Sequence, residues 1–408
     1  MQQNPAVALF LALGVIILAS RIGGTLARRL GQPRVLGELI VGVVLGPTLL
    51  NLLHAPLLNG VDLHETITQL AELGVLLLMF IVGLEVNIRE LAKVGVLAGI
   101  AGFIGAIAPV ILSVPLVMLF GYAWQPALFA GVTLAATSVS ISAQVLLELG
   151  VLRTKVGNAL LATALIDDVI AILLVSLAVA ISGSGSTASV EVGALVGIIV
   201  RMAAYLVGAF LLAWFGLPRL MHWLDRMPSV RQSHGIAAIA LLLALFYGWS
   251  AETFGGVAAI TGAFIAGVGF SRARDEVRHE IEAATSSIAY AFLVPIFFVN
   301  VGLQTDLRTF PLEGLPLAGL LLIVALISKV GGCGLGARLG GFNPRESLQL
   351  GVCMISRGEV GLIIASLGLS TGVFEVGHPL FASLFLVILL TTVVTPILVR
   401  QVFRESKA

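Results

Sequence analysis

Charge is what this sequence has least of. Lys, Arg, Asp and Glu together make up 11% of its 408 residues, whereas an ordinary soluble domain carries roughly a quarter charged residues. Hydrophobic residues make up 58%, and the mean hydropathy is +1.08. A folded chain of this composition could not cover its surface with polar groups, so its solvent must be lipid. The composition excludes an ordinary soluble domain and predicts a protein embedded in a membrane.

Cysteine and recognisable enzyme motifs are also scarce. Only Cys333 and Cys353 occur, both inside apolar segments, so neither a disulfide framework nor a cysteine metal site is predicted. The net charge is +1, and no basic stripe lies outside short loops, which argues against a nucleic-acid partner. We find no nucleophile–base set, phosphate-binding loop or metal-ligand helix motif. The sequence therefore predicts neither an enzyme nor a bound cofactor.

Long apolar runs dominate the chain instead. Many reach about 18 residues, enough to cross a bilayer as a helix, and they lack the alternation of a membrane barrel. The first run, PAVALFLALGVIILAS, is interpreted as a span rather than a signal peptide because no basic region precedes it. We expect one membrane unit over residues 1–408 without a soluble domain. The predicted fold class is an all-α polytopic membrane protein of about thirteen transmembrane helices, centred near residues 13, 42, 77, 106, 137, 168, 207, 242, 263, 292, 324, 358 and 388.

The distribution of basic residues predicts the orientation of these helices. With the N-terminus outside, nineteen of the 23 Lys and Arg residues fall in cytoplasmic loops or the C-terminal tail, and only Arg308 falls outside. Basic residues concentrate on the cytoplasmic side of membrane proteins. The chain is therefore expected in a bacterial inner (plasma) membrane with its N-terminus outside and its C-terminus in the cytoplasm.

Short segments of the two halves resemble one another at a nearly constant spacing. The offsets are 219 or 225 residues, for three matches: Gly83-Leu84 with Gly302-Leu303, Gly37 and Gly42 with Gly262 and Gly267, and Thr137-Ser138 with Ser356-Arg357. Matched spans are an odd number of helices apart, so the second copy would enter the membrane upside down. Small residues also recur by chance in glycine-rich membrane proteins, but three matches favour the inverted repeat typical of secondary transporters.

Two predicted spans carry polar residues where a continuous apolar helix is expected. AATSVSIS (135–142) places Thr137 and Ser138 in the middle of one span. ISRGEVG (355–361) places Arg357 and Glu359 in the middle of the other. Unwound carbonyls and hydroxyls are hard oxygen ligands suited to an alkali cation. Such hydroxyls also bond back to their own helix or pack between helices. The pattern predicts two broken helices and leaves both roles for the hydroxyls open.

Asp167 and Asp168 are adjacent carboxylates near the centre of an otherwise apolar span. A charge at that depth costs roughly 2.5 to 3.5 kcal/mol or more unless it is paired or hydrated. Successive helix residues point about 100° apart, so the two side chains can meet different surroundings. A group that holds either a proton or a metal cation already provides an exchange mechanism, whereas a structural ion pair is the alternative.

Three further charged residues lie in predicted spans. Lys329 has no acidic partner within four residues of its own helix and needs a carboxylate from another one. Arg357 and Glu359 share the second broken span, where they are expected to act as structural charges beside the half-helix ends. Entry of a cation could break a pair between Lys329 and an aspartate, although a permanently structural pair is also possible.

Five motifs in order resemble the monovalent cation/proton antiporter family, specifically its NapA-like sodium/proton branch. They are TSVSISAQVLLELGVL, LIDDVIAI, PIFFVNVGL, the mid-span Lys329 and SRGEVGLI, and the resemblance extends from GQPRVLGE to the last span. It implies a NapA/NhaA-like antiporter fold with two crossing broken helices. It also implies a homodimer in which a core moves like an elevator. The core would comprise approximately residues 67–182 and 284–372, and the dimerisation part approximately 1–50, 192–283 and 376–400.

The resemblance assigns roles by position. It implies that Asp168 binds the transported Na⁺ transiently as well as protons, that Asp167 pairs with Lys329, and that Thr137 and Ser138 lie beside the ion. Kef-type potassium relatives usually carry Gln-Asp at the acid pair, lack the lysine and have a nucleotide-binding domain. The sequence departs from that pattern, which favours Na⁺ or Li⁺ exchange for protons, with K⁺/H⁺ exchange as the alternative. A passive channel or a membrane scaffold is the alternative of another class.

Overall fold

The computed structural model describes residues 5–55, 58, 62–85, 94–182, 192–224, 235–304, 308, 310–370, 372–374 and 379–404. Every regular element in these ranges is a helix. The expectation of an all-α protein is therefore confirmed for the described part of the chain.

Nine α-helices are described between residues 5 and 224. They are α1 (Pro5–Arg29), α2 (Arg34–Leu45), α3 (His64–Glu85), α5 (Gly95–Leu119), α6 (Trp124–Ala135), α7 (Val139–Glu148), α8 (Lys155–Ser182), α9 (Val192–Leu211) and α10 (Leu217–Leu224). A π-helical turn, Leu212–Gly216, joins the last two, and a short 3₁₀ turn, Leu52–His54, follows α2.

The second half repeats this helical character. Its helices are α12 (Gly235–Ser250), α13 (Ala259–Phe270), α14 (Asp275–Ile288), α15 (Val294–Leu303), α16 (Leu315–Leu339), α17 (Pro344–Cys353), α18 (Glu359–Ser370) and α19 (Pro379–Arg404). π-helical turns extend α12 to Gly255 and connect α14 to α15, and a 3₁₀ turn, Leu312–Gly314, precedes α16.

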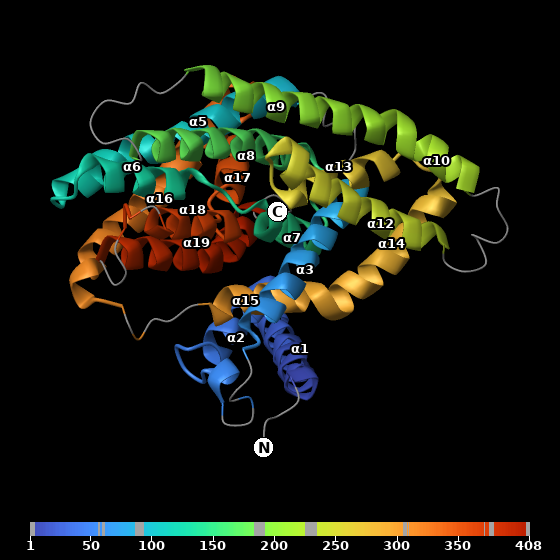
Figure 1. The fold of residues 1–408 in the computed structure, drawn as a ribbon, viewed down its shortest axis with the longest axis horizontal. Coiled ribbons are helices and arrows are strands. Elements are labelled where there is room, and N and C mark those ends of the chain that lie inside the picture. The colour runs from blue at the N-terminus through green and yellow to red at the C-terminus, as the bar shows by residue number, and fades with distance from the viewer. Residues whose placement is uncertain are drawn as a thin grey trace.

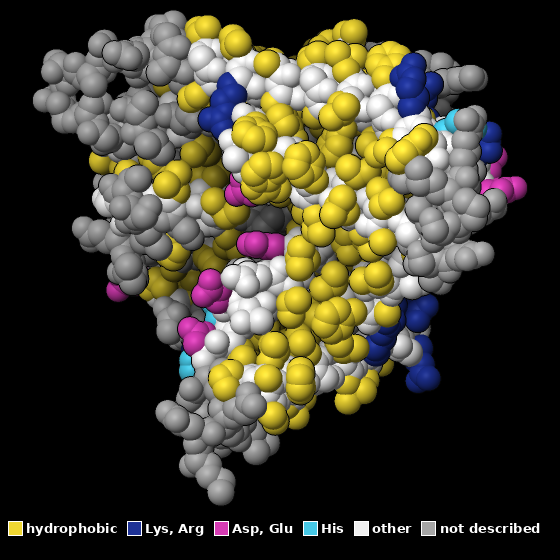
Figure 2. Space-filling view, turned by 45° about the vertical axis from the view of Figure 1, so that its right-hand side comes forward, with side chains coloured by type: hydrophobic (Ala, Val, Ile, Leu, Met, Phe, Trp, Pro, Cys, Tyr) yellow, Lys and Arg dark blue, Asp and Glu magenta, His cyan; other side chains and the backbone are white. Residues whose placement is uncertain are grey.

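The helices are long and apolar enough for a membrane protein of many spans. Ten helical segments of the described chain qualify as membrane spans by length and composition. The 12-residue α13 is a shorter apolar helix, and the other predicted centres fall on the 12-residue α2 and on the interrupted pair α17 and α18. All thirteen predicted centres fall on a helix or helix break, but thirteen crossings stay a prediction. Large apolar side chains cover much of the surface (Figure 2), as lipid contact requires.

Packing divides the helices into two groups (Figure 1). One group contains α5, α6, α7, α8, α16, α17, α18 and α19, and we call it the core bundle. The other contains α1, α2, α3, α12, α13, α14 and α15, and we call it the scaffold. The chain from α9 to α10 runs across both in Figure 1.

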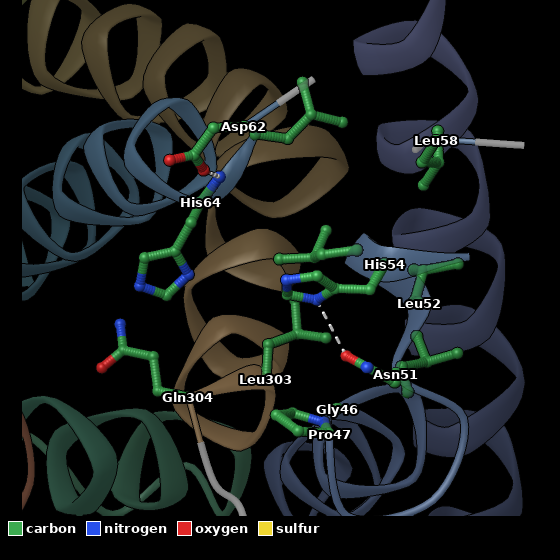
Figure 3. Close-up of a pocket in the computed structure, with 13 residues that line it drawn as sticks. Gly46, Pro47, Asn51, Leu52, His54, Leu58, Asp62, His64, Leu303 and Gln304 are labelled. Carbon is green, nitrogen blue, oxygen red and sulfur yellow. Dashed lines mark hydrogen bonds between the residues drawn. The ribbon is translucent and has the colours of Figure 1, made fainter. Parts of the chain in front are cut away.

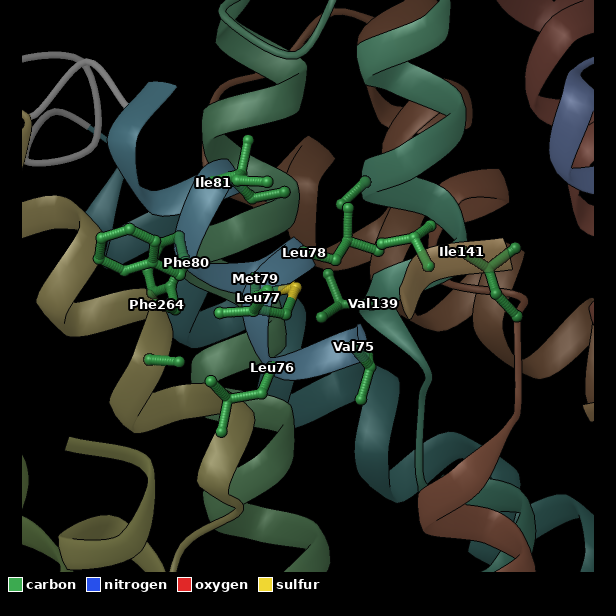
Figure 4. Packing of buried hydrophobic residues seen from close by; sticks show 14 of the residues in the cluster. Val75, Leu76, Leu77, Leu78, Met79, Phe80, Ile81, Val139, Ile141 and Phe264 are labelled. Carbon is green, nitrogen blue, oxygen red and sulfur yellow. The ribbon is translucent and has the colours of Figure 1, made fainter. Parts of the chain in front are cut away.

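The middle of α3 lies where the scaffold meets the core bundle. Its residues Val75–Ile81 are buried on all sides, and Figure 4 shows them between Val139 of α7 and Phe264 of α13. Phe80 also makes an edge-to-face contact with Phe270 of α13, with ring centroids 5.7 Å apart. A helix that is apolar all round is a buried one, which explains the unbroken apolar sequence of this stretch.

Several glycine pairs bring scaffold helices into backbone contact, and two of these pairs lie in the repeated segments. A Cβ on Gly42 of α2 would lie 3.0 Å from the Cα of Gly302 in α15, and a Cβ on Gly267 of α13 would lie 2.9 Å from the Cα of Gly83 in α3. The sequence matches pair Gly42 with Gly267 and Gly83 with Gly302. The two contacts are thus one arrangement that occurs twice, while the inverted topology of the repeat stays a prediction.

Candidate functional site

Both predicted helix breaks are present, and the two broken segments meet. The helix α6 ends at Ala135 and α7 begins at Val139, whereas α17 ends at Cys353 and α18 begins at Glu359. The backbone N–H of Ser138 donates to the carbonyl of Ser356 at 2.8 Å. The hydroxyl of Ser142 donates to the carbonyl of Cys353 at 2.5 Å. Contacts between the segments thus supply partners for backbone groups that the breaks release, as a protein interior in lipid requires.

Arg357 is fully buried at this crossing. Its Nε donates to the carbonyl of Leu134 at 3.0 Å, Nη1 to that of Ile355 at 2.6 Å and Nη2 to that of Ala325 at 3.0 Å. Leu134 lies in the last turn of α6, where helix carbonyls lack partners within the helix. A planar guanidinium with five N–H donors suits three convergent carbonyls better than a lysine would. The side chain thus links α6, the second break and α16.

The carbonyl of Arg357 is held in turn by α19. The hydroxyl of Thr392, which is fully buried, donates to this carbonyl and also to the carbonyl of Ile388 at 2.9 Å. Glu359, the other charge predicted in this span, begins α18, but its side chain lies outside the described residues.

Lys329 and Asp167 form a buried ion pair inside the core bundle. The Lys329 Nζ lies 2.8 Å from the Asp167 Oδ1, and both residues are 0% exposed. Ala325, which accepts a hydrogen bond from Arg357, precedes Lys329 by one turn of α16. The pair therefore lies next to the crossing. Removing one partner of such a pair strands a buried charge, which costs about 3 to 5 kcal/mol.

The side chain of Asp168 points in a different direction from that of Asp167, as the 100° step between successive helix residues requires. Its side chain is partly exposed and lines a small cavity of about 10 Å³ between the core bundle and the scaffold, which is room for about one water molecule. The hydroxyl of Thr261 in α13 donates to the Asp168 Oδ2 at 3.3 Å. On the surface, acidic side chains lie around a hollow in one face of the molecule (Figure 2). The two neighbouring carboxylates thus occupy different surroundings.

Several buried oxygen atoms near the crossing lack a hydrogen-bond partner in the described structure. They are Oδ2 of Asp167, Oγ1 of Thr137 and Oγ of Ser356. Thr137 and Ser356 belong to the two segments that meet through Ser138. A buried oxygen without a donor is destabilised by about 1 to 3 kcal/mol, and a hard cation or a water molecule would relieve this cost. The crossing is therefore chemically suited to an alkali cation.

The structure places the predicted residues at two adjoining positions. Thr137, Ser138 and Arg357 lie at the crossing, and Asp167 pairs with Lys329 beside it. Their roles in transport stay predictions.

Sequence reasoning missed Thr261 and Thr392. Threonines in apolar spans usually bond back to their own helix, as Thr392 also does, so nothing in the sequence distinguished these two. The segment TGAFIAG, which contains Thr261, drew attention only through its glycines.

A larger cavity of about 590 Å³ opens at the N-terminal end of α3 (Figure 3). His54, Asp62, His64 and Gln304 line it, and the imidazoles of both histidines point into it in the figure. The His54 Nδ1 lies 3.0 Å from the Asn51 Oδ1, and the backbone N–H of His64 donates to the Asp62 Oδ1 at 3.0 Å. Among the described residues, no group of three His, Cys, Asp or Glu side chains is arranged to hold a metal.

Comparison with known families assigns the chain. The family described as "Sodium/hydrogen exchanger, transmembrane" matches residues 15–405. The chain belongs to this family. The resemblance to the monovalent cation/proton antiporters inferred from five motifs is thereby confirmed, and the family consists of transporters rather than enzymes.

Relatives of this sodium/hydrogen exchanger family member match it over nearly its whole length. The Na(+)/H(+)-K(+) antiporter GerN of Bacillus cereus is 35% identical over 97% of this chain and 96% of its own length. A Na(+)/H(+) antiporter of Enterococcus hirae is 32% identical over 97% of this chain and 98% of its own length. The structure of the sodium proton antiporter MjNhaP1 from Methanocaldococcus jannaschii superposes with a TM-score of 0.69, at 18% identity, over 99% of this chain and 98% of that chain. The last likeness establishes a shared fold.

Proposed function

We propose that this protein exchanges Na⁺ or Li⁺ for H⁺ across a bacterial plasma membrane, and that cation and protons compete for Asp168 and Asp167. Membership of the sodium/hydrogen exchanger family supports this function, as do the printed activities of the relatives from Bacillus cereus and Enterococcus hirae. In the cell such exchange would serve sodium extrusion and pH homeostasis.

The buried Asp167–Lys329 pair next to a partly exposed Asp168 is the observation that carries the proposal. Asp168 is partly exposed and faces a small cavity, whereas Asp167 is held by a cation of the protein itself. A cation that enters beside Asp168 competes electrostatically with Lys329 for the neighbouring carboxylate. The entering charge then favours release of a proton from the site, and one proton released for each cation bound leaves the net charge of the core bundle unchanged.

The competition gives exchange in both directions. A cation bound at Asp168 excludes the proton from the same carboxylate, and a proton neutralises the carboxylate and releases the cation. Alternating exposure of the site to the two sides converts this exclusion into antiport. The free oxygens of Thr137 and Ser356 at the crossing are available to replace part of the hydration shell of the ion.

The packing supports an elevator-type movement of the core bundle against the scaffold. Asp168 and the crossing both belong to the core bundle, and the cavity at Asp168 lies on its boundary with the scaffold. We propose that the moving unit comprises α5 to α8 and α16 to α19, and that the scaffold forms a homodimer. This division differs from the sequence-predicted ranges because α19 packs on α16 and α17, while α3 and α15 pack on scaffold helices.

Proteoliposomes with an imposed pH gradient and a pH-sensitive dye test the function. Addition of Na⁺ or Li⁺ should collapse the gradient in the wild-type protein and should have no effect with Asp168→Asn. Uphill Na⁺ accumulation driven by the pH gradient distinguishes antiport from a channel. A wild-type protein that leaves the gradient intact with every alkali cation would contradict the proposal.

K⁺/H⁺ exchange is the second candidate, favoured by the printed name of the Bacillus cereus relative, which includes K(+). The same liposomes decide between the candidates when K⁺ replaces Na⁺. Collapse with K⁺ alone would assign the protein to potassium efflux. Collapse with both ions would mean that the protein transports Na⁺ and K⁺, the two ions in the name of that relative.

A further inference from the structure

We infer that Thr261 is a latch: its hydroxyl holds the carboxylate of Asp168 while no cation is bound, and the transported cation must displace it. This inference rests on the proposed function and adds a positioning residue to it. The observation is the hydrogen bond from the Thr261 Oγ1 to the Asp168 Oδ2 at 3.3 Å, which runs from the scaffold helix α13 to the core helix α8.

The position of Thr261 suits it to a carboxylate anion. Thr261 is 4% exposed and occupies the third position of α13, whose N-terminal end therefore lies close to Asp168. A helix N-terminus carries a partial positive charge. The hydroxyl is a donor to the carboxylate oxygen, and a donor to a charged acceptor forms a stronger bond than one to a neutral acceptor.

The latch and the cation compete for the same oxygen atom. A hydroxyl that donates to Oδ2 directs its hydrogen at the lone pair that an alkali cation would use. Both residues line the same small cavity, so an ion that binds Asp168 from this side lies beside Thr261. The free energy of the hydrogen bond must therefore be subtracted from that of cation binding, and the apparent affinity falls accordingly.

The bond also joins the two bodies that must slide past one another. Asp168 would travel with the core bundle, whereas Thr261 stays with α13, which packs on α3 and α12 of the scaffold. Breaking the contact is thus a necessary step of each cycle, and a cation that takes the carboxylate oxygen performs it. The latch links occupancy of the site to release of the core bundle.

Na⁺ titration of dye-loaded proteoliposomes tests the latch with three variants. Thr261→Val keeps the shape of the side chain and removes the hydroxyl, so the KM for Na⁺ should fall about two- to fivefold while kcat changes less than about twofold. Thr261→Ser restores the donor and should return KM to the wild-type value. Thr285→Val is the matched control, because Thr285 is a fully buried scaffold threonine whose hydroxyl has no partner among the described residues.

The outcomes separate the latch from the function on which it rests. If Thr261→Val does not reach the membrane, Thr261→Ala removes the same hydroxyl and should give the same fall in KM. An unchanged KM with active wild-type protein would contradict the latch alone, and a rise in KM would instead make the hydroxyl oxygen a ligand of the cation. A wild type that fails to respond to any alkali cation would contradict the proposed function itself.

Discussion

Two of the regions in which helices of this protein approach one another closely are built in opposite ways. At the crossing of the core bundle, interrupted helices expose backbone groups, and Arg357 and hydroxyl groups satisfy part of them. At the glycine contacts of the scaffold, continuous helices approach through Gly42 with Gly302 and Gly83 with Gly267. Close approach alone therefore does not make an ion site.

The difference lies in what the backbone leaves available. An unbroken helix satisfies its own carbonyls, so the glycine contacts gain dispersion energy and rigidity but offer nothing to an ion. The broken segments supply oxygen atoms, and the same breaks must be stabilised by buried charges. The scaffold is thus suited to a fixed support, and the core bundle to binding.

The largest effect is expected from Lys329→Gln in the core bundle. The substitution leaves Asp167 without its buried partner, so the free energy of unfolding should fall by about 3 to 5 kcal/mol, measured by thermal unfolding of purified protein. The double variant with Asp167→Asn should recover most of this loss. Lys155→Gln, which breaks an exposed pair with Glu346, is the control and should cost less than about 1 kcal/mol. A single variant as stable as wild type would contradict the account of this pair.

Arg357→Met should be the next most destabilising change. Three buried carbonyls lose their donor, at about 1 kcal/mol each, so a loss of about 3 kcal/mol is expected. Arg219→Met serves as control because its exposed guanidinium donates to the single carbonyl of Phe215. Equal losses for the two variants would mean that the crossing does not depend on Arg357.

Gly42→Ala tests the scaffold in the same measurement. Its methyl group would meet the α15 backbone, and overpacking of this kind costs about 1 to 3 kcal/mol. Gly267→Ala should cost a similar amount if the two contacts are equivalent copies. Gly14→Ala meets nothing within 4 Å and should be neutral or slightly stabilising. Unequal costs at Gly42 and Gly267 would argue against the repeat.

Ser142→Ala should have the smallest effect. It removes the donor to the carbonyl of Cys353 and should cost about 1 kcal/mol. Ser287→Ala removes an exposed hydroxyl that bonds to its own helix and should change stability by less than about 0.5 kcal/mol. If the two serines behave alike, the contact between the broken segments adds no stability.

Much of the site could be predicted because lipid makes polar residues conspicuous. Asp167, Asp168, Lys329 and Arg357 stand out in apolar spans, and the structure places all four in the core bundle. The helix breaks were visible for the same reason. Thr261 could not be predicted as a site residue because hydroxyl groups in membrane spans are common. The role of Thr261 depends on which helix faces α8, and the sequence does not show this.

The division of the fold was harder to predict than its helices. The apolar pattern locates α19 and α3 in the chain but does not predict which helices they pack against. Packing of α19 on α16 and α17 arises from contacts between residues distant in sequence. The glycine contacts were foreshadowed by the recurring segments, although the sequence did not show that Gly42 would meet Gly302.

Proton release on cation binding tests the central claim most directly. Purified protein in weak buffer with a pH-sensitive dye would receive NaCl, with choline chloride at equal ionic strength as control. Competition at the carboxylates predicts that Na⁺ releases protons near neutral pH, that choline does not, and that Asp168→Asn abolishes the release. Na⁺ binding to the wild-type protein, detected by calorimetry, without any proton release would contradict the account.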